Sequence, residues 1–298
     1  MSNPRRHHFV PKSYLRGFVE DDTGFLNVYS KRSDMWRRQK PSQVMVRNKF
    51  YHQDWAPNGV DKNILEKKLG VELEPKGLLA LKKLVETPET LNEVDTTNIL
   101  VYLQFQRIRV PRQADMAKSL AETAITIEMM KTPKGRESLK YGRVVIKDSF
   151  RFEFMKTVHG SLTPYFSRMI WEVVEAKPGT SFITSDSPVS FYNVDFMPPT
   201  EAGVALYGTI VSFPINQRFL LVMRHPEYEA GKKKASDTLP SDLDIEDGVI
   251  EIRKNIEWGK NEVHEQNRLM LQLSQDLIAG ESKAILENAV GEEIAGHR

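Results

Sequence analysis

The segment 99–110 constrains the fold most, because it is apolar on nearly every side and yet carries charged residues. In a helix each residue advances by about 100°, so its apolar residues point in almost all directions and predict an internal helix. A buried guanidinium needs a carboxylate or an anionic ligand beside it. We therefore expect the arginines to form internal ion pairs, to reach solvent with buried stems near Pro111, or to bind an anion. The polar members of the segment are Gln104, Gln106, Arg107 and Arg109.

Composition limits the class of protein and the chemistry open to it. The chain has 298 residues, of which 40% are hydrophobic and 28% charged, which excludes collagen-like and wholly disordered classes. It has no cysteine, so a metal would be held by His, Asp, Glu or Asn. No apolar run approaches the roughly 20 residues of a bilayer-spanning helix, and no apolar signal segment follows Met1–Arg6. We expect a cytoplasmic protein without a membrane partner.

The order of apolar patterns predicts an α+β fold in a single domain over 1–298, with a central helical region, antiparallel β hairpins and a long C-terminal helix. Proline is expected to break the helical region at Glu74–Pro75, and Gly280 to stop the last helix. The first expected part is a small basic β subregion (1–55) with strands at 25–29 and 44–46 around a turn at 31–40, and the second is a helical region (60–168) that ends in a helix over 149–168. The third is a β-rich region (169–253) with hairpins 170–174/181–184 and 209–214/219–224 and an exposed loop at 227–247. A helix over 255–278 follows.

Positive charge is concentrated at the start of the chain. Residues 1–50 hold 11 Lys and Arg against 4 Asp and Glu, whereas the whole chain has a net charge of only +2. Such a patch attracts phosphate backbones, with Tyr29 and Trp36 as stacking faces, or is simply a solvated basic surface. We expect a nucleic-acid partner if the patch is functional. Its members are Arg5, Arg6, Lys12, Arg16, Lys31, Arg32, Arg37, Arg38 and Lys40.

Candidate carboxylates precede the internal helix. When Leu65, Leu69 and Leu73 are projected as a buried stripe, Glu66 and Glu72 flank it and Glu74 lies on the opposite face. Glu66 and Glu72 are therefore the expected partners of the arginines. The alternatives are ligands for a divalent cation, together with Asp186 and a histidine, or ordinary surface pairs.

Adjacent histidines stand directly before an anchored turn. Pro11 can open a short helix, and Tyr14, Leu15 and Phe18 can hold it in the core, so at least one of His7 and His8 is expected to be fixed in place. Imidazole is the usual proton carrier near neutral pH. His8 is the preferred functional group, and Arg16 lies in the same turn.

Three polar residues occur where the pattern indicates buried or strand-end positions. Asp186 ends a strand, where it would either cap the backbone or present its carboxylate to a site. Asn267 and Ser274 fall inside the apolar stripe of the last helix. Buried Asn and Ser serve local hydrogen bonds or touch a ligand.

Several motifs together resemble the family called domain of unknown function 4238. They are His7–Pro11 with Tyr14–Phe18, Lys49–Tyr51, Glu66-Lys67 with a second glutamate, Gln106–Arg112 and Phe182–Val189, and the match extends to Asn267 and Ser274. The resemblance covers nearly the whole chain. It implies a common fold but no established activity.

The His-His-x-Val-Pro start is also similar to the opening of histidine-asparagine-histidine nucleases. That resemblance implies that the second histidine activates water opposite a metal-bound phosphate. Asn27 would be the middle member of the motif, and Trp36 stands where that family has a closing ligand.

Two functions follow from these patterns. In the first, a metal-dependent phosphodiesterase or nuclease gathers His7, His8, Glu66, Gln106, Arg107 and Asp186 in one catalytic cleft, with Arg16, Arg109 and Asn267 binding substrate and a divalent cation as the expected cofactor. The metal-binding residues themselves are left unassigned. In the second, the same groups form a structural polar network in a non-catalytic interaction protein.

Overall fold

The computed structural model describes residues 6–53, 59, 61–226 and 250–296. Helices and strands are mixed, and most strand pairs are antiparallel, so the predicted α+β class is confirmed. Arg5 and the whole of the predicted loop at 227–247 lie outside the described residues. No helix in the described ranges has both the length and the apolar character needed to cross a membrane.

A five-stranded sheet runs in the order β10-β5-β9-β8-β7, antiparallel except for the parallel pair of β10 and β5. The predicted hairpin over 209–224 is confirmed by the pairing of β8 with β9. The hairpin predicted for 170–184 is wrong, because β5 pairs with β9 and β10, both distant in sequence. The strands are β5 (Ile170–Ala176), β7 (Ser190–Tyr192), β8 (Ile210–Pro214), β9 (Phe219–Arg224) and β10 (Ile252–Trp258).

A four-stranded sheet, in the order β3-β2-β11-β6, joins the two ends of the chain. The expected turn at 31–40 contains a strand, β3, because its exposed Arg37 and Arg38 suit the solvated edge of a sheet. The strands are β2 (Leu26–Ser30), β3 (Met35–Gln39), β6 (Thr184–Ser185) and β11 (Leu277–Gly280).

A two-stranded ribbon of β1 (Arg6–His8) and β4 (Val46–Asn48) holds the histidine pair. His8 stands opposite Val46, and His7 opposite Arg47. The anchored turn after the histidines is confirmed: α1 (Lys12–Leu15) continues into a 3-10 turn, and Tyr14, Leu15 and Phe18 are buried.

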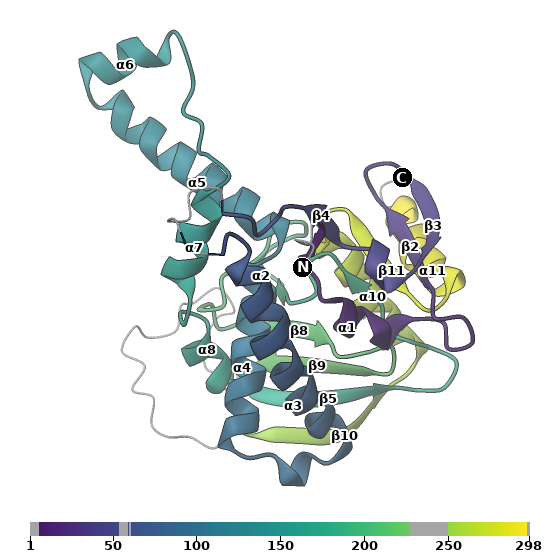
Figure 1. Ribbon diagram of the computed structural model, residues 1–298. Coiled ribbons are helices and arrows are strands. Elements are labelled where there is room, and N and C mark those ends of the chain that lie inside the picture. The colour runs from purple at the N-terminus through teal and green to yellow at the C-terminus, as the bar shows by residue number, and fades with distance from the viewer. Residues whose placement is uncertain (1–5, 54–58, 60, 227–249, 297–298) are drawn as a thin grey trace.

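Helices α3 and α4 cover one face of the five-stranded sheet, whereas α5 and α6 project away from it (Figure 1). The helix predicted over 149–168 is divided between α7 and α8, and the one predicted over 255–278 is shortened to α10 by strands at both ends. The helices are α2 (Ile64–Lys68), α3 (Glu74–Glu86), α4 (Glu93–Ile108), α5 (Pro111–Met130), α6 (Pro133–Leu139), α7 (Phe150–Val158), α8 (Thr163–Ser167), α10 (Lys260–Leu273) and α11 (Lys283–Gly296).

The helical region is not interrupted at Pro75, contrary to the expectation from the sequence. Residues Leu69–Leu73 form a π-helix that connects α2 to α3, and Pro75 lies in the first turn of α3, where its missing N–H costs nothing. A π turn holds about one more residue than an α turn, so it shifts the phase of the following helix by about 100°. This shift changes which residues of α3 face α4.

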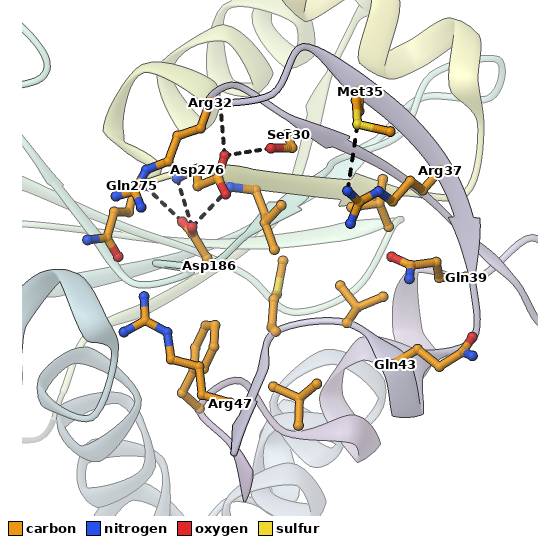
Figure 2. A pocket seen from close by; sticks show the side chains of 16 residues that line it. Ser30, Arg32, Met35, Arg37, Gln39, Gln43, Arg47, Asp186, Gln275 and Asp276 are labelled. Atoms are coloured by element: carbon orange, nitrogen blue, oxygen red, sulfur yellow. Dashed lines mark hydrogen bonds between the residues drawn. The ribbon is translucent and has the colours of Figure 1, made fainter. Parts of the chain in front are cut away.

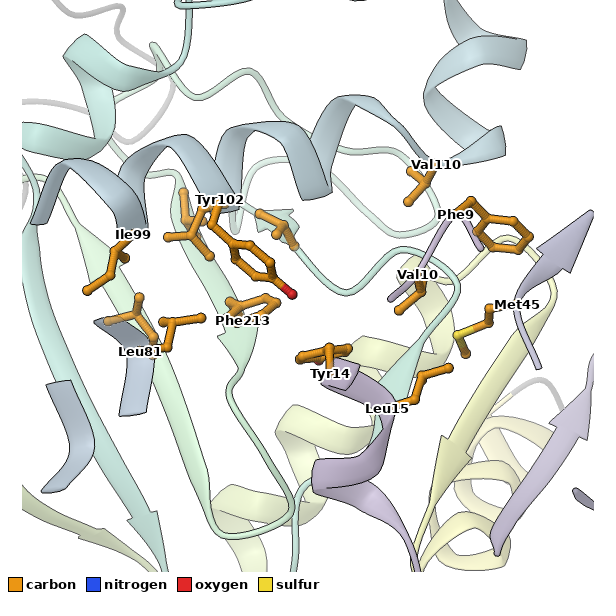
Figure 3. Close-up of a cluster of buried hydrophobic side chains, with 14 of the residues drawn as sticks. Phe9, Val10, Tyr14, Leu15, Met45, Leu81, Ile99, Tyr102, Val110 and Phe213 are labelled. Atoms are coloured by element: carbon orange, nitrogen blue, oxygen red, sulfur yellow. The ribbon is translucent and has the colours of Figure 1, made fainter. Parts of the chain in front are cut away.

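Helix α4 is internal, as its apolar pattern predicts. Ile99 and Leu103 are fully buried, and Ile99 and Tyr102 lie with Leu81 and Phe213 in one apolar cluster (Figure 3). Gly77 allows this packing, because a Cβ there would lie 2.5 Å from the Tyr102 Cβ. The close approach brings the start of α3 beside the end of α4.

Candidate functional site

Arg107, at the end of α4, makes a complete set of internal contacts. Its two terminal nitrogens each donate to Glu201 at 2.8 Å, and one also donates to the Val189 carbonyl at 3.0 Å. The guanidinium lies over the Phe191 ring, 4.1 Å from its centroid. Burial alone would raise the pKa of Glu201, but Arg107 and the nearby Arg112 hold it below its usual value. Arg107 is thus held in a fixed internal ion pair.

Arg109 is buried two residues further on, in a different environment. Its Nε donates to the Phe9 carbonyl at 2.9 Å, and its terminal nitrogens donate to Glu74 at 3.0 Å and to the His8 carbonyl at 3.3 Å. The partner of Arg109 is therefore Glu74, not Glu66 or Glu72. The π-helix accounts for this correction, because its phase shift turns Glu74 toward α4 and leaves Glu72 exposed.

Glu66 lies beside this cluster without forming an ion pair that joins it to Arg109. Its carboxylate accepts a hydrogen bond from the backbone N–H of His8. Burial raises the pKa of Glu66 to about 7, and the nearby Glu74 carboxylate adds to the effect while the Arg109 charge opposes it. The side chain is therefore partly protonated at neutral pH and can give or take a proton.

His8 is held with one ring nitrogen free. Burial lowers its pKa, and the positive charges of Lys12, Arg109 and Arg6 act in the same direction, so the ring is neutral at pH 7. The ring donates an N–H to the Pro41 carbonyl, whereas Nε2 is buried and has no hydrogen-bond partner in the part of the chain that the structure describes. Nδ1 therefore carries the proton, and the lone pair of Nε2 is available.

His7 positions its neighbours rather than offering a free group. The ring is fully buried and stacks on Tyr51 with 5.9 Å between centroids, and its Nδ1 accepts from the Tyr51 backbone N–H at 2.8 Å. The prediction that at least one histidine is fixed in place holds for both residues.

Further buried polar atoms near Arg109 have no hydrogen-bond partner among the described residues. They are the hydroxyls of Tyr51 and Tyr102 and the Oε1 of Gln106, whose Nε2 donates to the Phe9 carbonyl at 3.3 Å. Both tyrosines interact electrostatically with Arg109, and burial raises the pKa of both hydroxyls, so they stay protonated. Buried polar groups normally have partners, so such a group of unsatisfied atoms indicates a place for a ligand or ordered water.

Sequence reasoning did not select the two tyrosines. A signal existed for Tyr102, which stands four residues before Gln106 on the same helix and therefore on the same face. Nothing in the local sequence distinguishes Tyr51 from other buried aromatic residues, because its role depends on contacts with His7 and with charges on α3 and α4.

The other predicted site residues make their hydrogen bonds elsewhere in the fold. Asp186 accepts from the backbone N–H groups of Gln275, Asp276 and Leu277 at 2.8–2.9 Å, and so fixes the start of β11. Burial raises its pKa against the effect of these bonds. Asn267 accepts from the Ile183 N–H and donates to the Ser181 carbonyl, and Arg16 is exposed after α1.

The structure therefore brings together part of the predicted set. His7, His8, Glu66, Gln106 and Arg109 lie around one cluster with Tyr51, Tyr102 and Glu74, which we call the Arg109 cluster. Arg107, Asp186, Asn267 and Arg16 contribute none of the hydrogen bonds described for it. Within the described ranges, no group of three or more His, Asp or Glu side chains is arranged to hold a metal ion.

The basic N-terminal residues take several roles. Arg38 pairs with Glu20, and Lys31 donates to the carbonyls of Leu271 and Ser274 at the end of α10. Tyr29 and Trp36 pack on each other with 4.7 Å between centroids, so the two proposed stacking faces contact one another. Arg6 and Lys12 are exposed near His8.

Comparison with known proteins gives one match. The model of a family described as "Protein of unknown function (DUF4238)" matches residues 6–284. No curated protein and no solved structure matches the chain.

Proposed function

The chain belongs to the DUF4238 family of proteins of unknown function, and we propose that it is a phosphodiesterase that cleaves nucleic acid by acid–base catalysis at the Arg109 cluster. The observation that carries the proposal is the group of buried polar atoms without partners around Arg109, next to a carboxyl group that titrates near pH 7. Perturbed titratable groups beside unsatisfied polar atoms are typical of catalytic sites.

The protonation states of His8 and Glu66 suit the two proton transfers of hydrolysis. His8 is neutral with a free Nε2, so it can take a proton from the attacking water as the new O–P bond forms. Glu66 is partly protonated, so it can give its proton to the oxygen that leaves as the old O–P bond breaks. The reaction ends with His8 protonated and Glu66 ionised, and solvent restores both.

The charges around His8 favour an anionic substrate. Arg6 and Lys12 are exposed and lie close enough to lower the pKa of His8, and Arg109 adds a buried positive charge. A phosphodiester brought to this site would be attracted by all three and would place negative charge beside the histidine ring. This supports a polyanionic substrate such as nucleic acid.

A non-catalytic interaction protein is the second candidate. It is favoured by Arg107, Asp186 and Asn267, whose described contacts lie within the fold and hold segments distant in sequence. In that case the Arg109 cluster holds only water, and the purified protein would cleave none of the oligonucleotides in the assay described next.

The deciding experiment is cleavage of single- and double-stranded DNA and RNA oligonucleotides by the purified chain. We expect His8→Ala and Glu66→Gln each to lower kcat/KM about 10²- to 10⁴-fold, the usual contribution of a general base or acid. Glu72→Gln, an exposed glutamate two positions before Glu74, and His264→Ala in α10 are the matched controls and should leave cleavage unchanged. Cleavage that survives both His8→Ala and Glu66→Gln would refute the proposal.

The same assay tests the pH dependence and the divalent cation expected from the sequence. Cleavage should fall as pH rises above about 7, because Glu66 loses the proton it must donate, and the fall should be absent from the residual activity of Glu66→Gln. Parallel reactions with chelator and with added Mg²⁺ or Mn²⁺ measure the cation dependence.

A further inference from the structure

A small cavity lies beside β4, one of the two strands of the β1–β4 ribbon. It has a volume of about 230 Å³ and is enclosed by β2, β3, β4 and the segment that leads into β11. Figure 2 shows its side chains, with Arg37 on β3, Arg47 on β4, and Asp186 after β6 close to Asp276, which directly precedes β11. We call it the arginine cavity.

Three arginines from three separate segments line the arginine cavity. They are Arg32, which follows β2, Arg37 and Arg47, and all three residues are exposed. Within the described ranges, none of the three has a carboxylate within ion-pair distance, whereas the neighbouring Arg38 pairs with Glu20. Arg47 instead lies over the rings of Phe9 and Phe50. Arginines without an ion-pair partner are well suited to bind phosphate, because the planar guanidinium can donate two hydrogen bonds to its oxygens.

The two acidic residues of the wall form hydrogen bonds with the protein and no ion pair with any of the three arginines in the described structure. Asp276 Oδ1 accepts from the Ser30 hydroxyl at 2.8 Å and from the Arg32 N–H at 3.0 Å. Asp186 accepts three backbone N–H groups, as described above. The groups that can donate to a ligand are the three guanidinium groups and the side-chain NH2 groups of Gln39 and Gln43. One Arg37 nitrogen also contacts the Met35 sulfur, and the Gln43 amide oxygen accepts from the Lys40 N–H.

Phe9 connects the arginine cavity with the candidate active site. Phe9 is one of the residues that line the cavity, and its backbone carbonyl accepts hydrogen bonds from Arg109 and Gln106. His8 and Phe9 are adjacent, so a chain of phosphates that crosses the ribbon can contact both places. The cavity is smaller than the roughly 300–1,000 Å³ of sites for drug-sized ligands, which favours one phosphate group over a stacked base.

We infer that the arginine cavity binds a backbone phosphate of a single-stranded nucleic acid, next to the phosphodiester that is cleaved. This inference rests on the proposed function for the identity of the polymer. It assigns Arg37 and Arg47 to substrate binding. The sequence placed Arg37 in a basic patch with eight other residues and gave no reason to select Arg47. A free nucleotide offers the same phosphate chemistry, so the test separates the two sources.

The test measures binding without turnover. Fluorescence anisotropy would follow a labelled 12-nucleotide single strand on the His8→Ala protein, and on the same protein with Arg37→Gln, Arg47→Gln or Arg38→Gln added. Arg38 is the matched control, because it is the next residue of β3, points to the opposite face and is already paired with Glu20. Circular dichroism would confirm that each variant is folded.

We expect Arg37→Gln and Arg47→Gln each to weaken binding about 10-fold and to reduce the salt dependence, log Kd against log[salt], by about 0.7 for the lost phosphate contact. Arg38→Gln should stay within about twofold of the His8→Ala protein. Equal affinity and equal salt dependence for Arg37→Gln and Arg38→Gln would overturn the inference. Binding of 5′-mononucleotide or inorganic phosphate without binding of the strand would overturn the assignment to a polymer.

The outcomes separate this inference from the proposed function. If cleavage depends on His8 but binding ignores Arg37 and Arg47, the phosphodiesterase stands and the arginine cavity is not a phosphate site. If binding depends on both arginines and no strand is cleaved, the cavity stands as a nucleic-acid site and the proposed reaction is wrong.

Discussion

Arg107 and Arg109 stand two residues apart at the end of one helix, and their surroundings differ in one respect. Both are buried, with 5% and 2% of their surface exposed, and each has a glutamate and at least one backbone carbonyl as partners. None of the partners of Arg107 is left with an unsatisfied side-chain atom in the described structure. Around Arg109, His8, Tyr51, Tyr102 and Gln106 each have one.

This difference separates a structural ion pair from a candidate site more clearly than burial or charge does. A buried guanidinium requires a partner whatever its role, so the presence of a glutamate is uninformative. Polar atoms that remain unsatisfied carry a free-energy cost, and a fold that keeps several of them together has a use for them. The following predictions test this distinction.

The largest effect is expected for Arg107→Ala. The substitution leaves Glu201 buried without its bidentate partner, and such a loss costs about 3–5 kcal/mol of unfolding free energy. Urea denaturation followed by circular dichroism measures it. Arg107→Ala combined with Glu201→Ala should be less destabilised than the sum of the two single variants, because neither charge is then left alone. A loss below about 1 kcal/mol for Arg107→Ala would show that the ion pair is not structural.

A smaller effect is expected in the pH dependence of stability at Glu66. Its pKa rises from 4.5 to about 7 on folding, so between these values the folded state keeps a proton that the unfolded state has lost. Rising pH therefore lowers the stability of the parent over this window, and the loss is complete above pH 7. Glu66→Gln cannot lose a proton, so its stability advantage over the parent should grow from pH 4.5 to 7. Parallel pH profiles for the two proteins would contradict the raised pKa.

The smallest effect compares two buried tyrosines in one apolar cluster (Figure 3). The Tyr14 hydroxyl donates to the Pro214 carbonyl at 2.7 Å and lies 2.9 Å from Thr184 Oγ1, whereas the Tyr102 hydroxyl has no hydrogen-bond partner among the described residues. Tyr14→Phe should cost about 1–2 kcal/mol of unfolding free energy, and Tyr102→Phe should be neutral or slightly stabilising. Denaturant titration of both variants measures the difference. A cost for Tyr102→Phe equal to that of Tyr14→Phe would show that its hydroxyl is satisfied, for example by ordered water.

Patterns within short stretches of sequence correctly predicted the features that depend on residues close together in the chain. The internal position of α4 follows from its apolar residues on all sides, the anchored turn after the histidines from Tyr14 and Phe18, and the β8–β9 hairpin from two short runs joined by a polar turn. Gln106 and Arg109 were selected because they interrupt an apolar segment, Glu66 because it flanks a leucine stripe, and His8 because an anchored turn follows it. The structure places these four residues together.

Long-range pairing and helix phase account for what the sequence did not reveal. The π-helix rotates Glu74 onto Arg109, and a regular 100° projection cannot anticipate it. Glu201 lies in an irregular segment far along the chain, so nothing local marked it as the partner of Arg107. The strand β5 pairs with β10 across about 80 residues, because sheet pairing is decided by the fold as a whole.

The position of β11 has a consequence for how the protein is made. This strand, close to the end of the chain, lies between β2 and β6 and forms one wall of the arginine cavity. A ribosome releases the first strands long before residues 277–280 emerge, so the N-terminal sheet must wait for its central member. A polypeptide that stops short of residues 277–280 would carry its basic N-terminal strands on an incomplete sheet, so the cavity cannot assemble before this strand has been made.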